Sequence, residues 1–318
     1  MKTKKVVILG GGTGLSNVIN GLKSLPIEIT AVVAVSDNGS STGQLRREFS
    51  IPAVGDIRQV LTNLSTLPED IKNFMEYRLS TKSDLNGHAI GNLLLTCLLE
   101  ESKSLKTSIS ELSKLLQVKH TVLPLSEDYL TLCGETENGE IIEGEEEITQ
   151  ARKKYKRIFY KEEPHICPGI VKALKNADLI ILSTGSMLTS LIPNITCKEV
   201  ADAIRKSKAK KMYVCNAFTQ PGETDHCTVN DHINIINNYL GENSIDVVVA
   251  NNGKYPRKYI KKYRKEERKE LVVVDHENIK NAGYTLIEAP LLTDEDGTLK
   301  HDNLKLSAII FSYLMQNV

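Results

Sequence analysis

The most constraining feature of the sequence is a cluster of glycines between a short apolar segment and a helix-like one. The cluster reads Gly10-Gly11-Gly12-Thr13-Gly14 and follows an apolar run at residues 5–9. A continuous apolar run of this length is typical of a strand buried on both faces. Residues 15–25 then show helical spacing and end before Pro26. The segment therefore predicts a strand, a tight turn and a helix in direct succession.

Such a turn is suited to binding a phosphate group. Glycine lets the backbone turn tightly and lets a ligand come close, and the next helix offers unpaired N–H groups and the positive end of its dipole. We expect Gly11, Gly12, Thr13 and Gly14 to contact the phosphate. The P-loop pattern is absent, and the dinucleotide pattern G-x-G-x-x-G fails because Leu15 or Asn17 occupies its third glycine position. An NAD enzyme is therefore disfavoured.

The rest of the chain repeats the alternation of strand and helix. Apolar segments typical of strands recur at residues 27–35, 179–182, 211–215, 246–250 and 271–274, and an apolar helix is expected at 304–315. This rhythm predicts a doubly wound, mostly parallel, Rossmann-like α/β sheet in a single domain over residues 1–318. Residues 56–165 interrupt the rhythm with helical pieces and then a hairpin-like part, which turns at Asn138-Gly139 and has an acidic tip at 145–147. We interpret 56–165 as an inserted helical and hairpin region.

Composition and charge exclude several classes of protein. Lys and Arg total 40 and Asp and Glu total 40, so the overall charge does not favour a nucleic-acid partner. No apolar run is long enough to span a bilayer, and the one at residues 6–9 is too short for a secretory signal. The six cysteines contain no C-x-x-C pair, so neither a zinc site nor a redox motif is indicated. We expect a cytoplasmic homo-oligomer.

Four further loops carry candidate ligand-binding residues. Residues 36–43 follow the second strand, so they lie on the same sheet edge as the glycine cluster, where open α/β sheets bind ligands. Asp37 there could hold a metal ion or a ribose hydroxyl, and an ordinary polar loop is the competing interpretation. Residues 183–190 form a second candidate anion cradle, and residues 216–224 supply hydrogen-bonding groups. His88 could be a phosphate donor, a metal ligand or a capping group. The candidates in these loops are Asp37, Asn38, His88, Asn92, Gly185, Ser186, Asn216, Thr219 and Gln220.

Residues 254–269 combine basic side chains with three regularly spaced tyrosines. Tyr255, Tyr259 and Tyr263 recur at every fourth position. This spacing is typical of a helix side that packs on the body of a protein. A solvated helix face explains the basic residues better than a nucleic-acid patch does.

Taken together, these segments resemble the YvcK family of gluconeogenesis factors, which are relatives of the 2-phospho-L-lactate transferase of coenzyme F420 synthesis. The resemblance extends over nearly the whole chain. It is carried by the glycine cluster, the Asp37 loop with Arg46-Arg47, Gly55-Asp56-Ile57-Arg58, Gly87-His88-x-x-Gly91-Asn92, Ser186 with Thr189-Ser190 and Pro193-Asn194, and Thr219-Gln220-Pro221-Gly222-Glu223-Thr224. Two departures from the family pattern are Asn38, where a second aspartate is usual, and Ser183-Thr184.

The resemblance implies a ligand, a role and partners. Proteins of this family bind UDP-sugars such as UDP-N-acetylglucosamine, and they link growth on gluconeogenic carbon sources to cell-wall synthesis and cell shape. Partners in cell-wall precursor synthesis follow from that role. The resemblance also places Tyr263 and Lys300 near the sugar nucleotide, with Lys300 where arginine is more usual.

A non-enzymatic sensor is the first hypothesis, and a phosphotransferase like the coenzyme F420 relative is the alternative. Phosphoryl transfer needs positioning and charge neutralisation by a metal and cations. Asp37 with Mg²⁺, Arg46 and His88 could supply these. Mg²⁺ is the one candidate cofactor, and the sequence establishes no cofactor with certainty.

Overall fold

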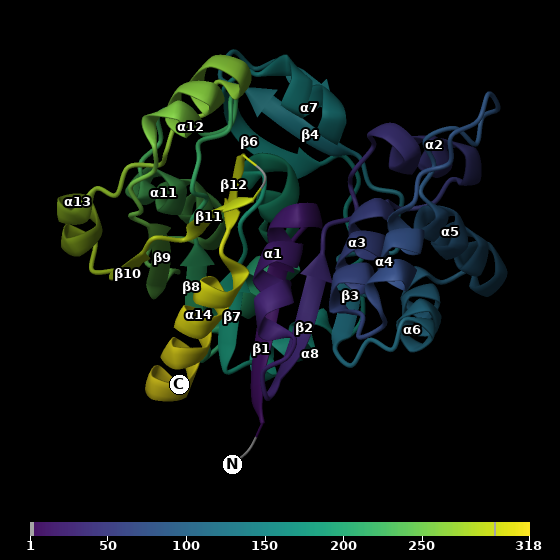
Figure 1. Cartoon of the computed structure of the whole chain (residues 1–318), viewed down its shortest axis with the longest axis horizontal. Coiled ribbons are helices and arrows are strands. Elements are labelled where there is room, and N and C mark those ends of the chain that lie inside the picture. Colours follow the sequence, from purple (N-terminus) through teal and green to yellow (C-terminus); the bar gives the residue numbers. More distant parts are fainter. Residues whose placement is uncertain (1–2, 296) are drawn as a thin grey trace.

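The structure is a computed structural model that describes residues 3–295 and 297–318. Its centre is a seven-stranded sheet in which every neighbouring pair of strands is parallel (Figure 1). The strands lie in the order β10-β9-β8-β7-β1-β2-β3. Their bounds are β1 Lys4–Gly10, β2 Ile27–Val33, β3 Thr121–Pro124, β7 Leu179–Leu182, β8 Lys210–Val214, β9 Val247–Asn251 and β10 Thr285–Ala289. The predicted parallel α/β fold is confirmed.

The two central strands are apolar because both of their faces are covered. Val6, Val7, Ile8 and Leu9 of β1 are at most 2% exposed, and all four residues of β7 are fully buried. From this centre the chain winds outward in both directions, through β2 and β3 on one side and through β8, β9 and β10 on the other. The boundary between β1 and β7 is therefore the switch point of the sheet, where open α/β folds form a crevice.

Helices cover both faces of the sheet. The chain moves from β1 to β2 in one direction along the sheet and from β7 to β8 in the other. Because both connections are right-handed, the helix after β1 and the helices after β7 lie on opposite faces. Figure 1 shows α1 and α14 side by side in front of the sheet and α8 behind it. The helices are α1 Gly12–Leu22, α2 Ser40–Phe49, α3 Gly55–Leu64, α4 Glu69–Glu76, α5 Ile90–Ser102, α6 Leu105–Leu115, α7 Glu145–Ala151, α8 Ile170–Asn176, η1 Met187–Leu191, α9 Ile192–Ile195, α10 Lys198–Lys206, α11 Val229–Leu240, α12 Arg257–Lys262, η2 Tyr263–Glu267, α13 His276–Asn281 and α14 Asn303–Asn317.

Two smaller antiparallel sheets lie above the carboxyl ends of the central strands. One has the order β5-β4-β6, with β4 at Leu132–Thr136, β5 at Ile141–Glu143 and β6 at Tyr155–Tyr160. The other is the hairpin of β11 (Leu292–Glu295) and β12 (Thr298–His301). Both stand at the end of the sheet where the loop candidates lie.

The segment 56–165 does not lie wholly outside the sheet. Helices α3 to α6 form a long crossover, but β3 returns to the central sheet and pairs with β2 as its edge strand. The expected hairpin at Asn138-Gly139 is present between β4 and β5. Residues 145–147 begin helix α7 and are not a hairpin tip, because acidic side chains suit the positive N-terminal end of a helix.

The last strand of the sheet also differs from the expectation. Residues 271–274 form only isolated bridges, Phe218 with Leu271 and Thr228 with Val273. The strand that pairs with β9 is β10, which is only half-buried and therefore carries a weaker apolar signal. Helix α14 covers the expected 304–315.

No helix in the described part of the chain combines the length and apolar character that crossing a bilayer requires.

Candidate functional site

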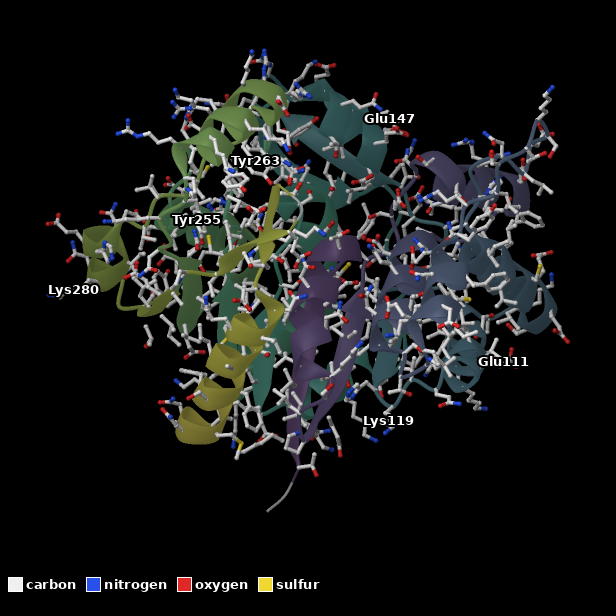
Figure 2. The ribbon with its side chains drawn as sticks, in the orientation of Figure 1. Glu111, Lys119, Glu147, Tyr255, Tyr263 and Lys280 are labelled. Atoms are coloured by element: carbon white, nitrogen blue, oxygen red, sulfur yellow. The ribbon has the colours of Figure 1, made fainter. Side chains whose placement is uncertain are left out.

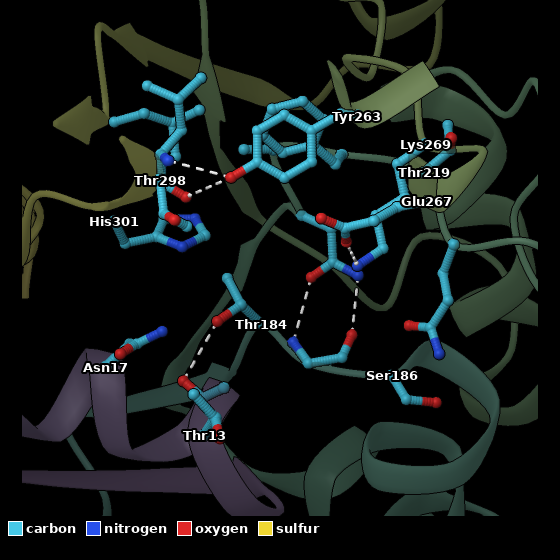
Figure 3. A pocket seen from close by; sticks show the side chains of 18 residues that line it. Thr13, Asn17, Thr184, Ser186, Thr219, Tyr263, Glu267, Lys269, Thr298 and His301 are labelled. Carbon is cyan, nitrogen blue, oxygen red and sulfur yellow. Dashed lines mark hydrogen bonds and ion pairs between the residues drawn. The ribbon is translucent and has the colours of Figure 1, made fainter. Parts of the chain in front are cut away.

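A cavity of about 380 Å³ opens at the switch point, between the loops after β1, β7 and β8. Figure 3 shows Thr13, Asn17, Thr184 and Ser186 on one side of the cavity and Tyr263 on the other. The lining combines hydrogen-bonding side chains, among them Asn216, Thr219 and Gln220, with the aromatic and aliphatic side chains of Phe218, Tyr263, Leu292 and Leu299. The Phe218 and Tyr263 rings have their centroids 4.5 Å apart. A ligand with one polar and one flat apolar part fits these two surfaces.

The glycine cluster brings the start of helix α1 to this cavity. Gly11 is the N-cap, with an extended backbone and no side chain capping the helix. Gly12 has a φ of +45°, which favours glycine. A methyl group on Gly14 would overlap the carbonyl oxygen of Thr184, so α1 can approach the loop after β7 this closely only with glycine there. Thr13 and Gly14 line the cavity, while Gly11 and Gly12 face Asp56 and lie outside its lining.

The loop after β7 already holds an anion, the carboxylate of Glu223. Ser186 Oγ donates to both Glu223 oxygens at 2.7 and 2.8 Å, and the Leu188 N–H donates to Glu223 Oε2 at 3.0 Å. Gln220 Nε2 donates to Glu223 Oε1 at 2.5 Å. The loop predicted to be an anion cradle, residues 183–190, therefore holds the chain's own Glu223 carboxylate. Burial raises the pKa of Glu223.

Gly185 and Asn216 form a reciprocal hydrogen-bonded pair. The Gly185 N–H donates to Asn216 Oδ1 at 3.1 Å, and Asn216 Nδ2 donates to the Gly185 carbonyl at 2.7 Å. Thr219 is tied in a similar way to Glu270, which accepts through its carbonyl and donates its N–H to Thr219 Oγ1. These pairs fix the loops after β7 and β8 against their neighbours, so their cavity-facing groups have set positions.

The loop after β2 lies beside a second, polar recess of about 320 Å³. Asp37, Asp56 and Asn92 line this recess with Arg58 and Arg78.

Asn38 and His88 do not line the recess but hold its surroundings in place. Asn38 donates to Glu147 Oε2 at 2.7 Å and accepts from the Glu146 N–H at 2.8 Å, so it fixes the start of α7. Buried His88 lies 2.8 Å from Ser41 Oγ, to which Asn92 Nδ2 also donates. The structure shows His88 in a hydrogen-bonded contact that joins Ser41 of α2 to Asn92 of α5. This contact differs from the phosphate, metal and capping roles that the sequence suggested.

Three carboxylates gather between the glycine cluster and the polar recess. The Gly12 N–H donates to the Asp56 carboxylate, and Thr189 binds Glu145. Desolvation, followed by the nearby charge of Asp37, raises the pKa of Asp56 to about 7. Desolvation and nearby carboxylates, Asp37 among them, raise the pKa of Glu145 to about 7 as well. A cation would relieve this repulsion.

Asp37 was the one residue predicted to hold a metal ion, and the structure places a second carboxylate, that of Asp56, in the same recess. Mg²⁺ is often held by one or two carboxylates together with water and substrate phosphate. No group of three His, Cys, Asp or Glu side chains within residues 3–295 and 297–318 has the arrangement of a metal site. The chemistry of Asp37 and Asp56 therefore suits a shared Mg²⁺ and phosphate, rather than an ion held by protein ligands alone.

Of the two residues that the resemblance placed near the ligand, Tyr263 lines the cavity and Lys300 does not. Tyr263 is 5% exposed, lines the cavity and accepts a hydrogen bond from the Leu299 N–H at 2.9 Å. Lys300 is exposed, pairs with Glu295 at 3.0 Å and does not line the cavity, whereas Thr298, Leu299 and His301 of the same strand do.

The predicted packing of the tyrosines in residues 254–269 is confirmed. Tyr259 and Tyr263 are buried in a small apolar cluster with Leu292 and Leu299. Figure 2 shows Tyr255 and Tyr263 within the fold, whereas Lys280 and Glu111 lie at its periphery.

Sequence reasoning missed three residues of the site. Asp56 was noted only as part of a resemblance, and Glu223 only as part of a loop. His301 lines the cavity beside Leu299, and desolvation lowers its pKa to about 4. Of the three, only Asp56 could have been singled out from the sequence, because it is the one acidic residue in the first turn of helix α3.

The fold and site define a class of α/β protein with an open cavity at the switch point of a parallel sheet. The model of the family "2-phospho-L-lactate transferase CofD" matches residues 6–292. The chain is 39% identical over 312 residues to the gluconeogenesis factor of Halalkalibacterium halodurans, covering 98% of this chain and 96% of that protein. It is 36% identical over 313 residues to the gluconeogenesis factor of Bacillus subtilis, covering 98% of each.

A solved structure agrees with these relatives. The crystal structure of a UPF0052 family member from Bacillus halodurans is similar, with a TM-score of 0.93 and 38% identity, and the match covers 98% of this chain and 99% of that one. The chain belongs to the CofD family, and the curated relatives described above are gluconeogenesis factors.

Proposed function

We propose that this chain is a cytoplasmic regulator that binds a UDP-sugar in the cavity at the switch point. The observation that carries the proposal is the pairing of two surfaces in one cavity, Thr13 and Gly14 in the first turn of α1 on one side and the Phe218 and Tyr263 rings on the other. A sugar nucleotide has both complementary parts, since its diphosphate suits a helix N-terminus and its base suits an aromatic wall.

The neighbouring side chains support a bound diphosphate better than a catalysed reaction there. Thr13 and Thr219 offer neutral hydroxyl groups, and Lys269 is the cavity-lining lysine. Phosphoryl transfer depends on several cations or metal ions around the reacting phosphate. A cavity with this lining can hold a ligand without strongly stabilising such a transition state.

The names of the relatives support a regulatory role. The relatives described above are called gluconeogenesis factors. A protein that binds a cell-wall sugar nucleotide and acts during gluconeogenic growth could couple carbon supply to cell-wall synthesis and cell shape. In this proposal, ligand binding changes a contact with an enzyme of cell-wall precursor synthesis.

A Mg²⁺-dependent phosphotransferase is the second candidate. It is favoured by the polar recess, in which Asp37 and Asp56 lie near the glycine cluster, and by the transferase name of the family model. Mg²⁺ bound there would neutralise phosphate charge, while Asp37 and Asp56 would position the ion.

Thermal melting against a small panel distinguishes the two candidates. The panel contains UDP-N-acetylglucosamine, UDP-glucose, GDP and NADH, each with and without Mg²⁺. A ligand at about 100 times its Kd adds roughly 2.7 kcal/mol of stability. A shift with UDP-sugars alone supports the regulator, whereas a shift with GDP and Mg²⁺ alone supports the transferase. No shift with any UDP-sugar at millimolar concentration would overturn the first proposal.

A further inference from the structure

The last helix, α14, has an apolar face that no other part of the described chain covers. One side of α14 is buried in the core through Leu306, Ile310 and Leu314, and α14 packs on α1 where Asn303 and Ser307 meet Gly21. A second apolar side faces outward, where Leu304 is 80% exposed and Met315 is 46% exposed. Figure 1 shows α14 at the front of the molecule, with no element in front of it.

The outward side of α14 forms a continuous groove with the spacing of a helix-to-helix seam. Leu304, Ala308, Phe311 and Met315 line the groove together with Leu25. Their separations are four, three and four residues, which is the alternation that lets one helix pack along another. A helix is therefore the element that best fits this groove.

The seam is self-complementary about a two-fold axis. If an identical helix runs antiparallel across it, Leu304 of one copy faces Met315 of the other, because the two positions are equally far from the centre of the seam. Ala308 likewise faces Phe311, so each large ring meets a small side chain. An isologous contact requires this kind of correspondence, in which residue i meets j and j meets i.

The charges around the groove also suit a second copy. None of the residues that line it is charged. The nearby Lys305 points its Nζ to Asp302 Oδ2 at 3.3 Å and to the Pro290 carbonyl at 2.9 Å, both within its own chain. Two copies therefore meet without repulsion, whereas a strongly charged partner would find no opposite charge.

From these observations we propose that α14 pairs antiparallel with α14 of a second copy of this chain, forming a two-fold symmetric dimer. The site at the carboxyl edge of the sheet is not part of the contact, so the dimer is independent of the proposed ligand.

Sedimentation velocity of the full chain over a range of concentrations tests the proposal. The wild-type chain should form dimers. Ala308→Asp, at an exposed position, should weaken dimerisation by roughly tenfold or more, because it places a carboxylate opposite Phe311 of the other copy. Asn317→Asp adds the same charge outside the seam and should leave the dimer intact. A monomer at all concentrations, or a dimer that Ala308→Asp does not weaken, would overturn the proposal.

Disulfide cross-linking tests the orientation. In a Cys97→Ser background, which removes the exposed native thiol, Leu304→Cys and Met315→Cys chains are prepared separately. Mixing the two under mild oxidation should give a cross-linked dimer, and either chain alone should give little. Efficient cross-linking of Leu304→Cys chains with each other would contradict the antiparallel arrangement.

Discussion

Ser186 Oγ donates hydrogen bonds to both carboxylate oxygens of Glu223, at 2.7 and 2.8 Å. The same carboxylate accepts from the Leu188 N–H at the start of η1. Glu223 therefore occupies the position in which an external anion would bind the loop after β7, and it joins this loop to the one after β8.

Glu223→Ala should destabilise the protein and expose an anion site. Removing the carboxylate leaves the Ser186 hydroxyl and the Leu188 N–H unpaired, which should reduce the free energy of unfolding by about 1–3 kcal/mol. Chemical denaturation measures this loss. Inorganic phosphate should then raise the melting temperature of the variant more than that of the wild type. Equal stabilisation of both proteins by phosphate would show that Glu223 does not fill an anion site.

Gly14→Ala should impair both stability and ligand binding. The added methyl group overlaps the Thr184 carbonyl, and overpacking of this kind costs about 1–3 kcal/mol. Gly139→Ala is the matched control, because no atom lies within 4 Å of its added methyl group and only its positive φ is strained. The melting temperature and the affinity for UDP-N-acetylglucosamine should both be lower for Gly14→Ala than for Gly139→Ala. Normal binding by Gly14→Ala would contradict the close approach of α1 to the loop after β7.

Stability should fall as the pH rises from about 4 to about 7. The pKa values of Asp56 and Glu145 are raised to about 7 in the folded chain, from ordinary values of 3.8 and 4.5. Over this interval the folded protein keeps protons that the unfolded chain has released, so unfolding becomes more favourable as the pH increases.

The variants Asp56→Asn and Glu145→Gln should each reduce this dependence. Both remove a charge that desolvation disfavours, so they should also raise the melting temperature at pH 8. The exposed Glu111→Gln serves as the control. Calorimetric melting from pH 4.5 to pH 8 provides the measurement. An unchanged slope in both variants would mean that these carboxylates do not hold protons near neutral pH.

Tyr263→Phe should loosen the wall of the cavity. The Tyr263 hydroxyl accepts from the Leu299 N–H, so its removal leaves that buried group unpaired at a cost of about 1–3 kcal/mol. Tyr259→Phe, whose hydroxyl binds Asp294 away from the cavity, is the control. We expect weaker binding of the UDP-sugar only for Tyr263→Phe. Equal affinities of the two variants would place the ligand elsewhere.

Much of the fold could be predicted because its central strands are continuous apolar runs followed by glycines. Residues 179–182 were assigned to a strand with the bounds that β7 has. Strand β10 was missed because it is half-buried and mixes polar with apolar residues. Strand β3 was assigned to a hairpin region because local sequence does not show that it returns to β2 after a crossover of five helices.

The site was harder to predict, because its geometry depends on contacts distant in sequence. Glu223 meets Ser186 across 37 residues, and no local pattern shows that it fills the predicted cradle. Asn38 resembled a ligand contact, yet it holds the start of α7, more than 100 residues away. Lys300 and His301 are neighbours in the sequence, and no local pattern shows that His301 lines the cavity while Lys300 does not.

The most direct test of the account is a calorimetric titration of UDP-N-acetylglucosamine into the wild type and into Asn17→Asp. Asn17 lines the cavity on α1, and the substitution adds one negative charge with little change in shape. Asn243→Asp, at an exposed turn outside the cavity lining, is the control. We predict saturable binding by the wild type and the control, and at least about tenfold weaker binding by Asn17→Asp through charge repulsion. Absence of heat with the wild type at millimolar ligand, or equal affinity in all three proteins, would contradict a UDP-sugar site at the switch point.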